Sequence, residues 1–288
     1  MHGLAVVDKP AGMTSHDVVN VLRRTLGERR IGHSGTLDPD ATGVLLCGVG
    51  SVTRVLRYLT DLRKTYTGEV VLGTDTSTLD ASGEVVARYE MAGVSVATAR
   101  AAARTLTGDI LQIPPMVSAL KIDGRRLHEL AREGIEVERA ARPVTVHRFD
   151  VDATDHPLVF AIEVQCSSGT YVRTLAQDLG HALGGGGHLR NLRRTAIGSF
   201  STGAGGANPL DDVRLLEPSA ALRDYASVTI DADTVALVQH GRVLPLAPRF
   251  VGDGPWAVLG PDGALVAVYE RHGEAAKPAV VLSDATAN

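Results

Sequence analysis

The stretch Gly35-Thr36-Leu37-Asp38-Pro39-Asp40-Ala41-Thr42-Gly43 places a carboxylate in a loop that is rich in glycine and polar residues. The whole segment 29–43 has this character, which predicts a long loop, and the apolar run 44–49 follows it. Pro39 biases the backbone of Asp38 toward an extended conformation. On spacing alone, Asp38 is more typical of an aspartate that forms a turn than of one that performs chemistry.

The same loop also fits the DxDxT pattern of phosphatases that use an aspartate as a covalent nucleophile. In that class the motif should directly follow an apolar strand, whereas residues 31–37 are not strand-like. A later acidic pair, Asp211-Asp212, also lacks an apolar strand before it. These departures argue against a phosphatase, which would show magnesium-dependent hydrolysis of esters.

Outward from the loop, helical and alternating patterns are mixed and do not form a regular βαβ series. A short apolar run predicts a strand at 3–7, and alternation of apolar and polar residues predicts strands at 66–73, 145–151 and 159–166. A further strand is expected at 84–89. Helical spacing predicts helices at 15–26, 52–62, 96–106, 127–133 and 171–183. We expect Thr14 or Ser15 to cap the first helix. We also expect 66–73 and 84–89 to form a hairpin and 183–187 to be a flexible break. The mixture predicts an α+β fold with a mixed, largely antiparallel sheet flanked by helices and loops.

The pattern changes toward the C-terminus. From Val228 onward, short strands and turns of glycine and proline dominate, with strands expected at 255–259, 264–269 and 278–282. We therefore predict a first domain at 1–224 and a small β-rich domain at 225–288. Acidic residues outnumber basic ones in the second domain, which argues against strong phosphate binding there.

Bulk composition excludes several classes of protein. The net charge of −4 is not that of a strongly basic nucleic-acid binder. Cys47 and Cys166 are isolated, which is typical of reduced thiols in a cytosolic protein. His181 and His188 flank a glycine run but lack a third ligand, so we expect no metal site. We find no secretory signal and no apolar run of about 18–20 residues, and we expect a cytoplasmic protein without a membrane span.

The longer segment 30–45 closely resembles the active-site motif of TruB-type tRNA pseudouridine synthases, in particular bacterial, actinobacterial-like members. Other segments resemble the remaining motifs of that family, and they follow in the family's order over roughly residues 3–200. They are 8–15, 64–66, 114–121 with 124–134, 168–175 and 189–195. The resemblance implies a pseudouridine synthase catalytic domain with an RNA-reaching insertion at about 112–145. The segment 225–288 resembles the PUA-like domain of the family only loosely.

The resemblance also implies an activity that is consistent with these residue types. Pseudouridine formation breaks the bond between C1′ and N1, turns the uracil and joins its C5 to C1′, so it needs no redox cofactor. Asp38 matches the carboxylate that attacks the sugar or base or stabilises the sugar, and Arg173 matches the cation that keeps it ionised. A uridine in folded RNA must be flipped out before it can react. Tyr66 matches the residue that stacks on the flipped base, and Tyr171 matches a second active-site tyrosine.

Further positions match family residues near the RNA. His33 matches a residue that holds the flipped conformation, and Leu192 matches an apolar wall of the pocket. Lys9 belongs to the N-terminal motif, where a lysine before Pro-x-Gly commonly supports a turn, and Asp80 matches an acidic residue near the RNA. Basic clusters lie near these motifs and predict phosphate contacts. They include Arg30 before the loop, Lys121 and Arg125 in the insertion, and Arg190, Arg193 and Arg194.

The resemblance implies a monomeric isomerase that converts uridine 55 in the T-loop of tRNA to pseudouridine, without a cofactor, a metal or an obligate protein partner. Recognition would rest mainly on the folded shape of the T-arm. Two alternatives remain: a guide-RNA-dependent pseudouridine synthase subunit, and an RNA chaperone that folds tRNA without catalysis. The RNA-reaching insertion and the lack of long basic tails favour the stand-alone enzyme.

Overall fold

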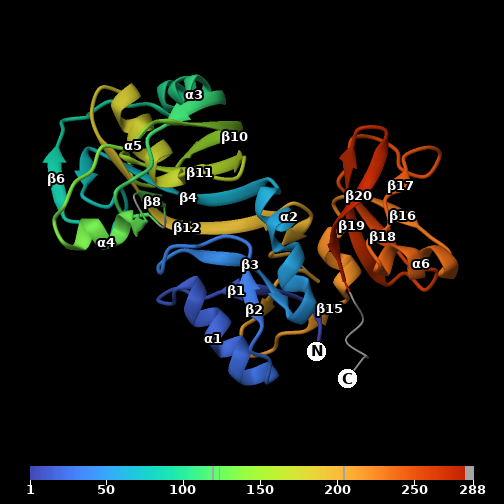
Figure 1. Ribbon diagram of the computed structural model, residues 1–288. Helices are drawn as coiled ribbons and strands as arrows, with labels where there is room; N and C mark the ends of the chain where they lie inside the picture. The colour runs from blue at the N-terminus through green and yellow to red at the C-terminus, as the bar shows by residue number, and fades with distance from the viewer. Residues whose placement is uncertain (119, 123, 204, 283–288) are drawn as a thin grey trace. The chain divides into compact units, whose positions relative to one another are not determined.

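A computed structural model describes residues 1–118, 120–122, 124–203 and 205–282 (Figure 1). The chain divides into two compact units. Unit 1 contains Met1–Asp38, Val44–Asp61 and the chain from Gly198 onward. Unit 2 contains Pro39–Gly43 and Leu62–Ile197. The predicted domain boundary between residues 224 and 225 rests on a change of sequence pattern and not on compactness, and it stays a prediction.

Unit 1 begins with a strand and a helix that the sequence predicts. β1 (Gly3–Lys9) is followed by α1 (Ser15–Leu26). Thr14 caps α1 because its hydroxyl accepts from the Asp17 N–H (3.1 Å), while the Asp17 carboxylate accepts from the Thr14 N–H (2.9 Å). The inner face of α1 presents Val18 and Leu22, which pack in one cluster with residues of β1 and β3. The predicted N-cap and helix are therefore confirmed.

The segment 29–43 is less irregular than we expected. β2 (Ile31–His33) pairs antiparallel with the end of β3 (Thr42–Val49), and Gly32 lies opposite Gly48. Strand pairing with a distant partner overrides the local glycine content here, so the prediction of an uninterrupted loop is wrong. The helix predicted at 52–62 is also divided, into a 3-10 turn η1 (Gly50–Val55) and α2 (Leu56–Asp61).

Short strands complete the N-terminal part of unit 1. β14 (Asn208–Pro209) pairs parallel with β1, and β15 (Leu215–Leu216) pairs antiparallel with it. β13 (Phe200–Ser201) and η2 (Pro218–Leu222) also precede the C-terminal sheet in the sequence.

The C-terminal part of unit 1 contains a five-stranded sheet of order β16-β18-β19-β20-β17. Its strands are β16 (Ala226–Thr229), β17 (Leu244–Pro245), β18 (Trp256–Leu259), β19 (Leu265–His272) and β20 (Ala275–Val281). Phe250, Trp256 and Tyr269 pack in its core. The three strands predicted here are confirmed, whereas β16 and α6 (Ala232–Gln239), which Asp231 caps, were not predicted.

α2 contacts this C-terminal sheet within unit 1. The Tyr58 hydroxyl donates to the Glu270 carboxylate (2.7 Å), and the Arg57 guanidinium lies 3.0 Å from the same oxygen. Burial raises the pKa of Tyr58 to about 12. Tyr58 is therefore a neutral donor to Glu270 throughout the neutral pH range.

Unit 2 is built on an antiparallel sheet of order β12-β4-β11-β10-β7. Its strands are β4 (Lys64–Leu72), β7 (Gly108–Gln112), β10 (Arg142–Ala153), β11 (Val159–Cys166) and β12 (Gly187–Ile197). α3 (Val96–Thr105) and α5 (Val172–Ala182) cover one face of it (Figure 1). The predicted α+β fold and the largely antiparallel sheet are confirmed.

The predicted hairpin pairs different segments. β5 (Thr74–Thr76) pairs with β6 (Val85–Arg88), while β4 pairs with β11 and β12. Gly73, with φ +88°, ends β4, and its carbonyl accepts from the Tyr89 N–H (2.9 Å). Because the chain turns at Gly73, only the residues beyond it reach β6.

The glycine run is not a flexible break. Gly185 and Gly186 are buried, and a Cβ on either residue would lie 2.4 Å from Met91 or Tyr89. Gly187 already belongs to β12, and its N–H donates to the Asp75 carboxylate (2.9 Å). The glycines are needed because two side chains lie against the backbone, which local sequence does not reveal.

The insertion contains β8 (Lys121–Ile122), β9 (Arg125–Arg126) and α4 (Leu127–Arg132). β8 and β9 pair antiparallel, and α4 matches the helix predicted at 127–133. No helix in the part of the chain that the structure describes is long and apolar enough to cross a membrane.

Gly43→Ala should destabilise the protein by about 3 kcal/mol or more, because the new Cβ would lie 2.1 Å from the Arg194 carbonyl oxygen at φ +104°. Gly27→Ala is the matched control: Gly27 has φ +63°, but a Cβ there meets nothing within 4 Å, so only about 1 kcal/mol is expected. Urea denaturation of both variants measures the difference. Equal losses would show that the approach of β12 to Gly43 is not tight.

Candidate active site

The start of α5 carries a buried arginine whose partners include two backbone carbonyls and a carboxylate. Arg173 is 5% exposed. Its Nη1 donates to the Thr78 carbonyl (2.9 Å), and its Nη2 donates to the Val117 carbonyl (2.8 Å). The Asp80 carboxylate lies 3.5 Å from Nη1. The two ends of the guanidinium fork are thus fixed in different directions.

Asp80 is held in a tight turn of its own. Its carboxylate accepts from the hydroxyls of Thr78 (2.6 Å) and Ser82 (2.5 Å) and from the Ser82 N–H (3.0 Å). The Leu189 N–H donates to the Leu79 carbonyl, so the turn is also bonded to β12. The structure therefore brings together two predicted site residues, Asp80 and Arg173.

β12 carries the other predicted residues of the last motif. Its pairing with β4 is interrupted between Arg190 and Arg193, and Asn191 has φ +55°, so Leu192 lies in a bulge. Arg193 pairs in register with Thr42, and its Nη1 donates to the Thr42 hydroxyl (3.2 Å).

Arg194 and Tyr66 lie opposite one another on β12 and β4. Tyr66 is 7% exposed and Arg194 is 1% exposed. Such burial does not suit the phosphate contact expected of Arg194, because a phosphate group would have to reach a fully covered guanidinium. Arg194 instead lies in the interior beside the strand that carries Tyr66.

The N-terminal motif lies in unit 1. Lys9 is fully buried, and its ammonium donates to the carbonyls of Pro10 (2.9 Å) and Met13 (2.7 Å). This geometry agrees with the turn-supporting role expected of a lysine before Pro-x-Gly. The turn leads directly into the cap of α1.

Asp38 is half-buried, and the residue before it, Leu37, is hydrogen-bonded to α1. The Leu37 N–H donates to the Ser15 hydroxyl (2.9 Å) at the start of α1. His33 lies in β2, where its Nδ1 accepts from the Gly35 N–H (3.3 Å), and Arg30 is exposed. After Asp38 the chain enters 39–43, whose last two residues pair with Arg193 and Arg194.

The insertion presents exposed basic residues that are partly neutralised. Lys121 and Arg125 are exposed, and Arg125 forms an ion pair with Glu133. The hydrogen bond between them raises the pKa of Arg125 and lowers the pKa of Glu133. This pairing partly neutralises the charge of Arg125, and the phosphate contacts of the insertion stay a prediction.

The two histidines beside the glycine run have local partners in the structure. His181 Nε2 lies 3.1 Å from the Asp75 carboxylate, and His188 Nδ1 lies 3.0 Å from the Thr74 carbonyl. Asp75 also receives the Tyr89 hydroxyl (3.1 Å) and is itself buried. Both histidines therefore support β5.

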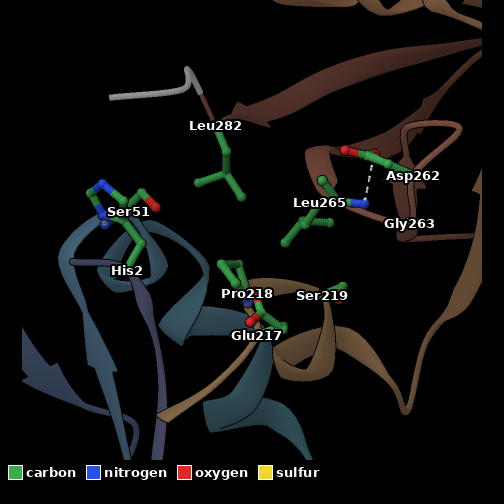
Figure 2. A pocket seen from close by; sticks show the side chains of 10 residues that line it. His2, Ser51, Glu217, Pro218, Ser219, Asp262, Gly263, Leu265 and Leu282 are labelled. Carbon is green, nitrogen blue, oxygen red and sulfur yellow. Dashed lines mark hydrogen bonds between the residues drawn. The ribbon is translucent and has the colours of Figure 1, made fainter. Parts of the chain in front are cut away.

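A pocket of about 450 Å³ lies elsewhere, within unit 1 (Figure 2). His2, Ser51, Glu217 and Asp262 contribute its polar groups. His2 Nδ1 accepts from the Ser51 N–H (3.0 Å), and the Asp262 carboxylate accepts from the Ala264 N–H (3.1 Å). None of the predicted site residues lines this pocket, so it does not bear on their chemistry.

Comparison with family models covers most of the chain. The model described as TruB family pseudouridylate synthase (N terminal domain) matches residues 23–172, just over half of the 288 residues. The model described as tRNA pseudouridylate synthase B C-terminal domain matches 173–217. The model described as tRNA Pseudouridine synthase II, C terminal, matches 225–283.

Curated relatives match over nearly their whole length. The tRNA pseudouridine synthase B of Arthrobacter sp. (strain FB24) is 44% identical over 98% of this chain and 97% of its own. The tRNA pseudouridine synthase B of Rhodococcus jostii (strain RHA1) is 46% identical over 99% of this chain and 95% of its own.

Solved structures share the fold. A Cbf5-Nop10-Gar1 complex has a chain with a TM-score of 0.74 and 24% identity, covering 98% of this chain and 84% of that one. An H/ACA RNP bound to a substrate RNA containing 2'-deoxyuridine has a chain with a TM-score of 0.73 and 23% identity, covering 98% and 85%.

Arg173→Lys should lower the free energy of unfolding by about 1–3 kcal/mol, because one ammonium cannot replace both ends of the fork and a buried carbonyl is left unsatisfied. Arg190→Lys is the control, since Arg190 pairs with Glu69 with its side chain 42% exposed and such a pair contributes about 0–1 kcal/mol. Urea denaturation compares the two variants. Similar small losses would mean that the two carbonyl contacts do not fix Arg173.

Proposed function

Because this chain belongs to the TruB family of pseudouridylate synthases, we propose that it is the isomerase that converts uridine 55 in the T-loop of tRNA to pseudouridine. The observation that carries the proposal is identity of 44–46% to curated tRNA pseudouridine synthase B proteins over nearly the full chain. The run of family motifs around Asp38, Tyr66 and Tyr171 supports the same activity.

The reaction moves a base without transferring electrons. The bond between C1′ and N1 breaks, the uracil turns, C5 joins C1′, and the proton on C5 is released while N1 gains one. A carboxylate that attacks or stabilises the sugar or base, together with groups that move protons, is chemically sufficient for this sequence. We accordingly propose an enzyme without a cofactor.

We assign the working carboxylate to Asp38, with Arg173 as the cation that keeps it ionised. Tyr66 stacks on the flipped base, and Tyr171 contacts the base or sugar or transfers a proton. Flipping costs a few kcal/mol, which stacking on an aromatic ring offsets. Support for Arg173 comes from its buried, doubly anchored guanidinium, whose position is set before RNA arrives.

RNA contacts on the periphery belong to the same proposal. His33 and Leu192 border the flipped nucleotide, and Asp80 acts through Arg173. Lys9 supports the N-terminal turn, and Arg194 supports the strand pairing around Tyr66. Exposed or half-buried basic side chains contact phosphates, namely Arg30, Lys121, Arg125 and Arg193.

We further propose a monomer that works alone in the cytoplasm on the folded T-arm, with the catalytic domain at 1–224 and the PUA-like domain at 225–288. The match over nearly the whole chain to relatives named tRNA pseudouridine synthase B favours this over a guide-RNA-dependent subunit. The similarity to H/ACA structures lies below 25% identity and concerns the fold.

Asp38→Asn should reduce pseudouridine formation in a T-arm transcript on the order of 10⁴-fold, because the amide keeps the shape but cannot act as a nucleophile or stabilise positive charge. Carbodiimide modification followed by primer extension locates the product at uridine 55. Asp40→Asn, two residues away and exposed, is the matched control and should keep wild-type activity.

An Asp38→Asn variant with the wild-type rate would contradict the assignment of the carboxylate. A wild-type protein that refolds the T-arm without modifying it would instead support the chaperone alternative.

A further inference from the structure

The side-chain amide of Gln112 forms two hydrogen bonds with the backbone of Tyr171, one with its N–H and one with its carbonyl. The Tyr171 N–H donates to Gln112 Oε1 (2.8 Å), and Gln112 Nε2 donates to the Tyr171 carbonyl (3.1 Å). Both distances are those of well-formed hydrogen bonds. Gln112 is 2% exposed, so the pair forms away from water.

Tyr171 is the N-cap of α5, and its own side chain makes no capping bond. Its carbonyl accepts the first bond of the helix from the Leu175 N–H (3.2 Å), whereas its N–H lies at the helix start, where backbone N–H groups have no intrahelical acceptor. An amide of suitable length offers one donor and one acceptor side by side, as a neighbouring strand would. Gln112, the last residue of β7, supplies that pair across 59 residues of sequence.

The same segment also holds Arg173. Val117, five residues after Gln112, accepts from Arg173 Nη2 (2.8 Å). Pro114 and Pro115 lie between the two anchors and are buried, which restricts how the anchors move relative to one another. The beginning of the insertion at 112–145 thus contacts both Tyr171 and Arg173.

A second pair of bonds fixes the loop that precedes Tyr171. The Ser167 N–H donates to the Thr145 carbonyl (2.8 Å), and the Thr145 N–H donates to the Ser167 hydroxyl (2.9 Å). Thr145 lies on β10 at the other end of the insertion. The loop before α5 is consequently held where the insertion leaves the sheet and where it returns.

We propose that Gln112 is a positioning residue of the isomerase, because its amide fixes the Tyr171 backbone. Together with Val117, which bonds Arg173, the beginning of the insertion then determines the positions of both Tyr171 and Arg173. The inference rests on the proposed function for the roles of those two residues. The pair of hydrogen bonds between Gln112 and the Tyr171 backbone, called the Gln112 clamp below, can be tested by hydrogen exchange without any catalytic turnover.

The test compares Gln112→Ala and Gln112→Glu with wild type in full-length protein. A displacement of about 1 Å at a reacting group can cost on the order of 100-fold in rate, so Gln112→Ala should lower kcat about 10- to 100-fold with KM for a T-arm RNA little changed. Hydrogen exchange measured by mass spectrometry on a peptide spanning 168–176 should become faster, because the Tyr171 N–H loses its acceptor.

Gln112→Glu adds a second measurement, the pH dependence of kcat, which a general loss of structure would not change in the predicted direction. An ionised glutamate accepts from the Tyr171 N–H but repels its carbonyl oxygen, whereas a protonated one restores both bonds. Burial raises the pKa of such a carboxyl, so the kcat of Gln112→Glu relative to wild type should rise as the pH falls from about 8 to about 5.5. Asp109 on β7 and Arg142 on β10, the charged neighbours in the sheet, are unchanged in every variant.

Gln177→Glu is the control: Gln177 is half-buried on α5, the helix that Tyr171 caps, and this variant should show neither the loss of kcat nor its recovery at low pH. Wild-type kcat and unchanged exchange at 168–176 in Gln112→Ala would overturn the proposal. So would a loss in Gln112→Glu that does not recover at low pH.

A wild-type protein that forms no pseudouridine would refute the proposed function. In that case the exchange rate at 168–176 still decides whether Gln112 clamps Tyr171.

Discussion

Arg173 carries a positive charge that is almost wholly withdrawn from water, and such a charge must be satisfied by polar groups of the protein. The carbonyls of Thr78 and Val117 and the carboxylate of Asp80 are among the groups that meet this requirement. Each group belongs to a segment with its own anchor: the turn that carries Thr78 and Asp80 is bonded to β12, and Val117 follows the Gln112 clamp. Proper placement of one buried guanidinium therefore requires α5, the turn and the base of the insertion to be correct together.

This arrangement suits a reaction in which the protein supplies shape and electrostatics. Groups that are fixed before the substrate binds do not have to reorganise when charge develops in the transition state. The cost is tight backbone packing around the strands that support the site. Gly43 lies against the Arg194 carbonyl, and the buried glycines before β12 lie against Met91 and Tyr89.

Local sequence was sufficient where an element is specified by its own residues. Thr14 and Asp17 define the start of α1, and alternation defines β11, so both were predicted correctly. Prediction from local sequence failed where contacts with distant residues determine the structure. β2 forms only by pairing with β3, and Gly185 and Gly186 become ordered because two side chains cover them. Gln112 was missed for the same reason, since only its contact with Tyr171, 59 residues away, distinguishes it from any polar strand residue.

The central claim is that this chain isomerises uridine by breaking the glycosidic bond and forming a bond at C5, using its own side chains. The most direct measurement is tritium release from a T-arm stem-loop labelled at C5 of its uridines, incubated with purified protein in EDTA without added cofactor. The account predicts release of the label from one uridine, position 55, at a rate that EDTA does not change. No release by the wild-type protein, or release that needs an added metal or cofactor, would contradict it.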